Sequence, residues 1–208
     1  GVVSIEAPTR WVMSRDADAI EVPSTVEGVL QARLDRLTAS AREVLHRAAV
    51  VGRTFWRGSL IALGCDDRSL DAHLNELQER ELVFKRGDSA IHGDIEYIFK
   101  QTLVRDVAYE NLLRSQRIQH HQAVASWLAK HRHGRGDDFM LGHHFERGGR
   151  PESAVLAYLG AANAALDSNA LEEALSVHGR ALAIADRHPE VEVTPSWSAT
   201  SLPADSVV

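Results

Sequence analysis

Apolar residues recur at helical spacing along most of the chain, and one stretch alternates instead. The first helical stripe follows Pro23, where Ser24 and Glu27 stand at the spacing of a capping box. Five apolar positions share one face of this predicted helix: Val26, Val29, Leu30, Leu34 and Leu37. The pattern therefore predicts a helix with one buried face that begins near residue 24.

Further helical stretches follow before residue 82. Ser40 and Glu43 repeat the capping spacing for a second helix that Gly52 would end. Its apolar stripe is Val44, Leu45, Ala48 and Val51. A short helix comes next, and then Asp66 or Asp67 caps a longer one. The apolar positions of that longer helix are Leu70, Leu74 and Leu77.

The period changes from helical to alternating between residues 82 and 100. Gly87-Asp88 and Gly93-Asp94 mark turns between two predicted strands. Three helices followed by a hairpin is the element order of a winged helix. The opening of the chain also alternates, around 2–5 and 10–13, which predicts a separate small hairpin.

Beyond residue 101 the pattern is helical again, with predicted helices over about 102–113, 115–133, 137–147, 151–167 and 170–187. The last three are rich in small residues that let helices approach closely, at Ala154, Ala157, Ala161, Ala174 and Ala181. Residues 188–208 are polar and aperiodic, which predicts a disordered tail. The predicted fold class is mainly α: a winged-helix module with a small β-hairpin wing, followed by the start of a helical array similar to tetratricopeptide repeats.

Composition limits the partners and the compartment. The 208 residues carry a net charge of -6 with a pI near 6.0, which favours neither nucleic acid nor an anionic membrane surface. A single Cys65 cannot form an internal disulfide, so we expect a reducing cytoplasm. No run approaches the roughly 20 apolar residues of a membrane span. Because the chain begins with Gly1, we interpret it as a piece of a longer protein.

The sequence lacks the motifs of independent catalysis. No Gly-x-x-x-x-Gly-Lys loop occurs, so we expect no ATP hydrolysis, no bound cofactor and no enzyme activity from this piece alone. The run Arg147-Gly-Gly-Arg150 is interpreted as a turn between helices and not as a phosphate loop. Adjacent histidines on a helix point about 100° apart, which argues against one shared metal ion. The densest histidine groups are His120-His121, His131 with His133, and His143-His144.

A winged helix raises the alternative of DNA binding, which depends on the charge of the helix over 67–81. That helix holds two arginines against five acidic side chains, a net charge of -3. Contacts to phosphates dominate DNA affinity and require cations, so this helix would be repelled from a major groove. The wing supplies only Lys85, Arg86 and Lys100 in compensation.

Three segments together resemble bacterial signal-transducing ATPases of the STAND class. They are VPSTVEGVLQARLDRLTASAREVLHRAAVVGRTF (22–55), YIFKQTLVRDVAYENLLRSQRIQHHQAVASWL (97–128) and the run from HHFERGG to RALAIA (143–185). The resemblance is to the region after the AAA-type ATPase module in large proteins that also carry an adenylate or guanylate cyclase or a DNA-binding output domain. It implies that ATP or ADP and Mg are bound in that ATPase module.

The resemblance also implies a domain map. Residues 1–22 would end the ATPase module, 23–114 would form the winged helix, 115–187 the repeats, and 188–208 the tail. In this family the winged helix closes over the nucleotide-binding domain and the repeats bind a protein or peptide partner. The expected partners are therefore the protein's own ATPase and output domains and a ligand of the repeats.

Two residues are predicted to build the junction between winged helix and repeats. Phe99 would end the wing strand in the core, and Tyr109 would fill a gap while its hydroxyl finds a partner. Leu103, Val107 and Leu112 are predicted to bury one face of the connecting helix.

Polar residues near this junction are candidate contacts to the ATPase module, and a solvated helix surface is the alternative interpretation. They are Arg33, Asp35, Arg36, Lys100, Gln101, Arg105, Asp106 and Arg117. Members of the family often carry His where Gln101 stands, and in related switches a winged-helix His reads the nucleotide phosphates. Gln101 therefore departs from the pattern that the resemblance implies for nucleotide sensing. The simplest interpretation of Arg33, Asp35 and Arg36 is pairing at i,i+3 on a helix surface.

The sequence thus predicts a regulatory segment without catalysis, which transmits the nucleotide state of an ATPase module to partner binding and to an output domain. Two alternatives stay open: a DNA-binding winged helix of a transcriptional regulator, and a scaffold whose repeats bind peptide.

Overall fold

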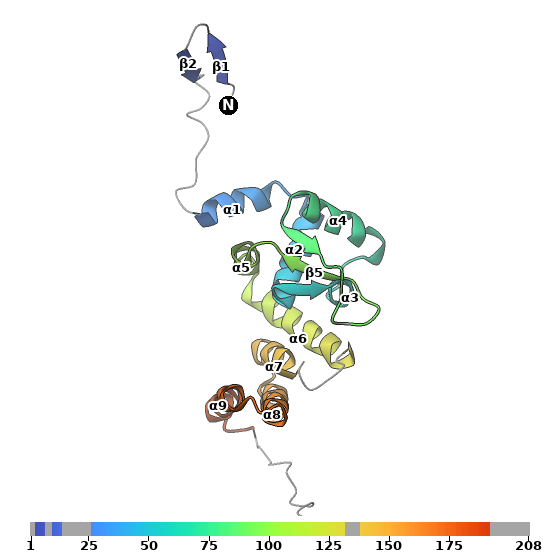
Figure 1. Cartoon of the computed structure of the whole chain (residues 1–208), viewed down its shortest axis with the longest axis vertical. Helices are drawn as coiled ribbons and strands as arrows, with labels where there is room; N and C mark the ends of the chain where they lie inside the picture. The colour runs from blue at the N-terminus through green and yellow to red at the C-terminus, as the bar shows by residue number, and fades with distance from the viewer. Residues whose placement is uncertain (1–2, 7–9, 14–25, 132–137, 192–208) are drawn as a thin grey trace, which may run out of the picture.

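The computed structural model describes residues 3–6, 10–13, 26–131 and 138–191 (Figure 1). This part of the chain is mainly helical with a small antiparallel sheet. The Ser24 cap, His133 and residues 192–208 of the predicted tail lie outside the described residues. The opening hairpin is confirmed: β1 (Val3–Glu6) pairs antiparallel with β2 (Arg10–Met13).

Four helices follow in the order that the apolar stripes predict: α1 (Val26–Asp35), α2 (Ala39–Val51), α3 (Arg57–Ala62) and α4 (Asp67–Glu79). Most of the predicted stripe positions are buried, because they face one common core. Val29 is an exception with 47% exposure, so its place on the buried face of α1 was wrong.

The cap of α2 differs from the capping box predicted at Ser40. The helix begins at Ala39 with Thr38 as its cap, two residues before Ser40, and the Thr38 hydroxyl accepts a hydrogen bond from the main-chain N–H of Ala41 at 3.2 Å. Glu76 of α4 binds both the N–H and the hydroxyl of Thr38, at 3.1 and 2.8 Å. Thr38 therefore caps α2 and also ties it to α4. For α4 itself Asp66 is the cap, as predicted.

The sheet has three strands where the sequence predicted two. β5 (Glu96–Phe99) lies in the centre, between β4 (Val83–Lys85) and β3 (Thr54–Trp56), and both pairings are antiparallel. β3 was missed because three residues are too few for an alternation to be recognised, and its partner is about 40 residues away. Phe55 of β3 stacks on Tyr97 of β5 with ring centroids 5.5 Å apart.

Five helices form the rest of the described chain: α5 (Thr102–Glu110), α6 (Arg114–His131), α7 (Asp138–Arg147), α8 (Pro151–Asp167) and α9 (Leu171–Arg187). All five predicted small contact residues of α8 and α9 are buried. Gly142 of α7 lies so close to Tyr158 of α8 that an added Cβ would stand 2.8 Å from its ring. The absence of a side chain at Gly142 therefore sets the spacing of α7 and α8.

One hydrophobic core runs from α1 through the sheet and α5 to α6, and it includes Leu141 of α7 and Ala157 of α8. Helix α6 contacts α2 and α3 on one side and α7 on the other (Figure 1). Trp56 of β3 packs against Trp127 of α6, with ring centroids 5.8 Å apart. A second, smaller core joins α8 and α9. The two predicted domains therefore share apolar contacts through α6.

Candidate functional site: the junction of α5, α6 and α7

The sheet passes directly into α5, and Phe99 anchors the passage. Phe99 is 1% exposed in the main core, and its N–H donates to the carbonyl of Arg53 at 2.9 Å. The buried face of α5 is formed by Val104 and Ala108, whereas Leu103 is 37% exposed. The predicted burial of Phe99 is confirmed. The predicted burial of Leu103 was wrong, because the next residue, Val104, faces the core in its place.

Tyr109 lies at the centre of this junction, half-buried between α5 and α6. Its ring is flanked by the guanidinium groups of Arg105 and Arg117, at 5.0 and 4.6 Å from the ring centroid. Its hydroxyl lies 3.0 Å from Nε2 of His121. The sequence predicted that this hydroxyl would find a partner, and the partner is a histidine of α6.

His121 continues the contact into α7. Its Nδ1 lies 2.9 Å from Nδ1 of His144, and both side chains are only 1% exposed. Nε2 of His144 is buried and makes no hydrogen bond to the described residues. Because both rings are neutral, we assign the Tyr109 hydroxyl as donor to Nε2 of His121, and Nδ1 of His121 as donor to Nδ1 of His144. Hydrogen bonds thus join α5, α6 and α7 in one chain.

Burial keeps both histidines neutral. It lowers the pKa of His121 to about 2, with the charges of His144, His143 and Arg147 acting in the same direction. Burial also lowers the pKa of His144 to about 3, and the neighbouring His143 adds to this effect. Neutral imidazoles that are hydrogen-bonded to each other hold the helices together. Within the described ranges, no cluster of three or more His, Cys, Asp or Glu side chains could hold a metal ion.

Arg105 and Arg117 hold the ends of this junction. Arg105 donates from Nε to the carbonyl of Ala49 in α2 at 2.9 Å. Arg117 donates from Nε to the carbonyl of Leu112 at 3.0 Å, and it pairs with the Glu110 carboxylate at 2.8 Å. Both cations therefore fasten α5 to its neighbours within the described chain.

Three further predicted contact residues lie at or near the start of α5 and make only local contacts. Lys100 pairs with Glu81 at 3.1 Å, Asp106 pairs with its neighbour Arg105 at 3.0 Å, and Gln101 precedes α5 without a side-chain capping bond.

The pairing predicted within Arg33, Asp35 and Arg36 was wrong. Arg33 donates to the carbonyl of Arg80 at 3.0 Å, and Asp35 lies 3.8 Å from Arg42. Arg36 is exposed on the surface. Helix α1 is thus tied to α4 and α2, because the turn after α1 brings these partners closer than the next turn of its own helix.

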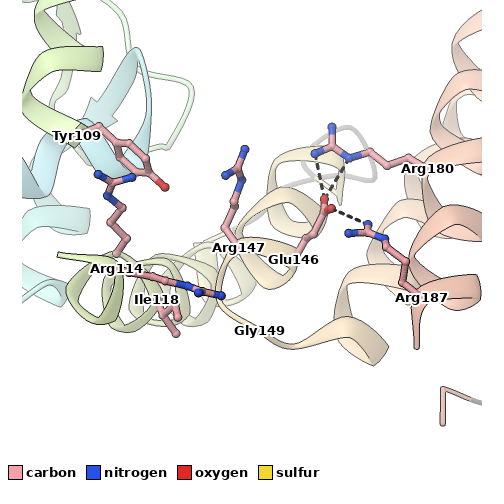
Figure 2. A pocket seen from close by; sticks show the side chains of 9 residues that line it. Tyr109, Arg114, Ile118, Glu146, Arg147, Gly149, Arg180 and Arg187 are labelled. Atoms are coloured by element: carbon pink, nitrogen blue, oxygen red, sulfur yellow. Dashed lines mark hydrogen bonds and ion pairs between the residues drawn. The ribbon is translucent and has the colours of Figure 1, made fainter. Parts of the chain in front are cut away.

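A pocket of about 610 Å³ opens beside Tyr109, between α6, α7 and α9 (Figure 2). Its lining comprises Tyr109, Arg114, Arg117, Ile118, Glu146, Arg147, Gly149, Arg180 and Arg187. We call it the arginine pocket. Only Tyr109 and Arg117 of this set were predicted from the sequence as candidate residues. The other arginines of the lining are up to about 70 residues apart in the sequence. They come together only through the packing of the helices, so no local sequence pattern predicts the pocket.

Glu146 is the single acidic residue of the lining. Its carboxylate lies 2.9 Å from Nη2 of Arg180 and 3.3 Å from Nη2 of Arg187, and it accepts the Tyr158 hydroxyl hydrogen bond at 3.1 Å. Burial opposes the ionisation of Glu146, but Arg180 and the Tyr158 hydroxyl outweigh it and lower the pKa of this carboxyl. Glu146 is therefore a stable anion on one wall of the pocket.

Comparison with known proteins finds similarity to a much longer bacterial protein. An uncharacterized protein of Rhizobium meliloti (strain 1021) is 26% identical to this chain over 209 residues. The alignment covers 95% of this chain and 19% of the relative, so the chain spans about a fifth of that protein's length. No family model and no solved structure matches the chain. Among the described helices, none is long and apolar enough to cross a lipid bilayer.

Proposed function

We propose that this chain is a regulatory segment without catalysis in a multidomain signal-transducing ATPase. A winged-helix module (23–114) couples the nucleotide state of an ATPase module to helical, tetratricopeptide-like repeats (115–187), and through them to an output domain. The observation that carries the proposal is the shared core at α6, which packs against α2 and α3 and also against α7. A helix that belongs to both parts can transmit a displacement between them.

The order of elements supports the two halves of this proposal. Helices α2 to α4 followed by the β4–β5 hairpin match the order of a winged helix, with β3 as the third strand. The antiparallel helices α7 to α9, with small residues at their contacts, match the start of a repeat array. The relative of five times the length supports a multidomain parent.

The mechanism is a two-state switch in which the junction is the coupling element. ATP or ADP, with Mg, bound in the ATPase module favours one of two positions of the winged-helix module. The hydrogen bonds from Tyr109 to His121 and on to His144 carry this position to α7. A ligand of the repeats biases the same equilibrium from the other end, because coupling between two sites is reciprocal.

Direct DNA binding has weaker support. The acidic side chains of α4 face solvent or pair with neighbours, as Asp67 and Asp71 do with Arg57 at 2.7 and 2.8 Å. This surface would repel a phosphate backbone.

The scaffold alternative rests on a specific observation: large apolar side chains of α8 and α9 are exposed, namely Leu156, Leu166, Leu171, Leu175 and Leu182. Such a surface fits further repeats or a peptide.

The test uses the parent protein and its coding sequence. A Gly-x-x-x-x-Gly-Lys loop encoded upstream of Gly1 is expected, and its absence would overturn the ATPase assignment. Hydrogen exchange of the parent should then differ at α5 and α6 between ATP and ADP. Tyr109→Ala should remove this difference from α7, while the exposed neighbour Leu113→Ala should preserve it. Equal exchange in both nucleotides would refute the switch.

A further inference from the structure

The arginine pocket concentrates positive charge in an acidic protein. Its lining holds five arginines and one glutamate, an excess of four positive charges, whereas the whole chain has a net charge of -6. The arginines come from three helices: Arg114 and Arg117 from α6, Arg147 from the end of α7, and Arg180 and Arg187 from α9 (Figure 2). Guanidinium groups repel one another, so their convergence in one pocket is unfavourable unless an anion is present.

Glu146 satisfies only part of this charge. It holds Arg180 and Arg187, and Glu110 outside the pocket holds Arg117. The side chains of Arg114 and Arg147 make no hydrogen bond or ion pair with any residue in the described part of the chain. Figure 2 shows the Arg147 side chain between Tyr109 and Glu146, and Arg114 below Tyr109 on α6 beside Ile118.

The positive charge of the pocket also affects His143, which lies next to it. After burial, Arg147 and Arg180 are the groups that most lower the pKa of His143, which lies against the buried histidine pair. Gly149 takes up a left-handed conformation with φ +69 at the turn after α7, and nothing lies within 4 Å of the place of its missing Cβ. The sequence favoured a turn at 147–150. At this turn Gly149 lines the pocket without a side chain that would fill it.

The shape of the pocket fits a compact ligand. Small-molecule sites occupy roughly 300–1,000 Å³, and this pocket has about 610 Å³. Tyr109 and Ile118 add apolar surface to one wall. Arginine offers a planar fork of donors that pairs with two oxygens of a phosphate at once. Arg114 and Arg147 each offer such a fork to a phosphate oxygen pair, whereas Glu146 already supplies one negative charge to Arg180 and Arg187.

We infer that the arginine pocket binds a small phosphate-bearing anion with at least two negative charges, held mainly by Arg114 and Arg147 with Arg117 beside them. The ligand would connect α6 with α7 and α9, and so it would fix the position of the helical array on the rest of the chain. This inference concerns the described chain alone and is independent of the ATPase assignment.

A structural role for Arg147 is the competing explanation. A cation in the last turn of a helix is favoured by the helix dipole without any ligand. An acidic peptide segment is the competing ligand, because carboxylates also pair with arginine. Both alternatives give results that differ from those of a phosphate site.

The test is calorimetric titration of the chain with pyrophosphate at constant ionic strength. Saturable binding of one pyrophosphate per chain is expected. Arg114→Gln and Arg147→Gln should each weaken it about tenfold or more, because each removes a charge-assisted contact. Arg68→Gln on the exposed face of α4 is the matched control and should leave the affinity unchanged. Glu146→Gln should tighten binding, since it releases Arg180 and Arg187 to the ligand. Circular dichroism of each variant verifies the fold.

Three results would overturn the inference. The first is the absence of saturable pyrophosphate binding to the folded wild-type chain. The second is equal affinity in Arg147→Gln and Arg68→Gln, which leaves Arg147 with a role at the helix end only. The third is binding of sulfate or of an oligoglutamate peptide as tight as that of pyrophosphate, which would assign the pocket to anions in general or to acidic segments.

Discussion

Acid should destabilise this protein through the buried pair His121 and His144, and replacing one of them should reduce that sensitivity. The ordinary pKa of histidine is 6.5, and burial lowers the pKa of these two rings to about 2 and about 3 in the folded chain. Below pH 6.5 these two histidines therefore bind protons in the unfolded chain but stay unprotonated in the folded chain. Stability is complete above about pH 6.5 and is lost as the pH falls toward the folded pKa values.

The magnitude follows from the pH difference. One pH unit corresponds to about 1.4 kcal/mol for each proton bound only by the unfolded chain. At about pH 5 each ring accounts for a loss of about 2 kcal/mol, so the pair accounts for about 4 kcal/mol. That is a large share of the roughly 5–15 kcal/mol that stabilises an ordinary domain. Burial lowers the pKa of other histidines in the same direction, namely His46, His120 and His143.

The assay is urea unfolding of wild type and His121→Gln at about pH 7.5 and about pH 5. Glutamine keeps an amide that can bond Tyr109, but it does not titrate. The loss of unfolding free energy between the two pH values should be smaller in the variant by about 2 kcal/mol. The exposed His178→Gln on α9 is the control and should retain the wild-type loss. If His121→Gln retains it too, the ring is protonated in the folded protein and the assigned hydrogen-bond chain is wrong.

Three further predictions concern helix packing, a helix cap and the reactivity of a buried thiol. Gly142→Ala should lower stability by about 1–3 kcal/mol in thermal unfolding, because its Cβ would stand 2.8 Å from the Tyr158 ring. Gly179→Ala, where nothing lies within 4 Å, should raise stability by up to about 1 kcal/mol, and equal effects at both glycines would contradict the close approach. Thr38→Ala should cost about 1 kcal/mol in urea unfolding, and an unchanged midpoint would exclude a capping role. Burial raises the pKa of the Cys65 thiol, so iodoacetamide should modify it far more slowly in the folded chain than in urea, and equal rates would show an open site.

The helices were predictable because their apolar residues repeat with the period of the helix, and the burial of Leu70, Leu74 and Leu77 follows from that alone. The phase of a short helix is harder to predict. In α5 both Leu103 and Val104 are apolar, and the packing of α5 against α2 and α1 decides that Val104 turns inward. The strand at Thr54–Trp56 depends on pairing with a distant segment, which no local window contains.

The junction was predictable only in part. The sequence indicated Tyr109 because an aromatic residue with a hydroxyl requires a partner when it is buried. Its partner His121 belongs to the pair His120-His121, for which the helical spacing argued against a shared metal ion and indicated no contact with Tyr109. Helix packing brings His144 from α7 to meet it, and the arginine pocket arises in the same way. Both features depend on the relative placement of α6, α7 and α9, which local periodicity does not encode.

The contact between Trp56 and Trp127 provides the molecule with an internal optical reporter. The two indoles lie 5.8 Å apart with an interplanar angle of 32°, one on the sheet and one on α6. At this separation their excited states couple, so the near-ultraviolet circular dichroism carries a signal from the pair. A sliding movement of α6 over the sheet would change that signal while leaving helix content constant. The transmission of motion through α6 can therefore be followed in solution without any label.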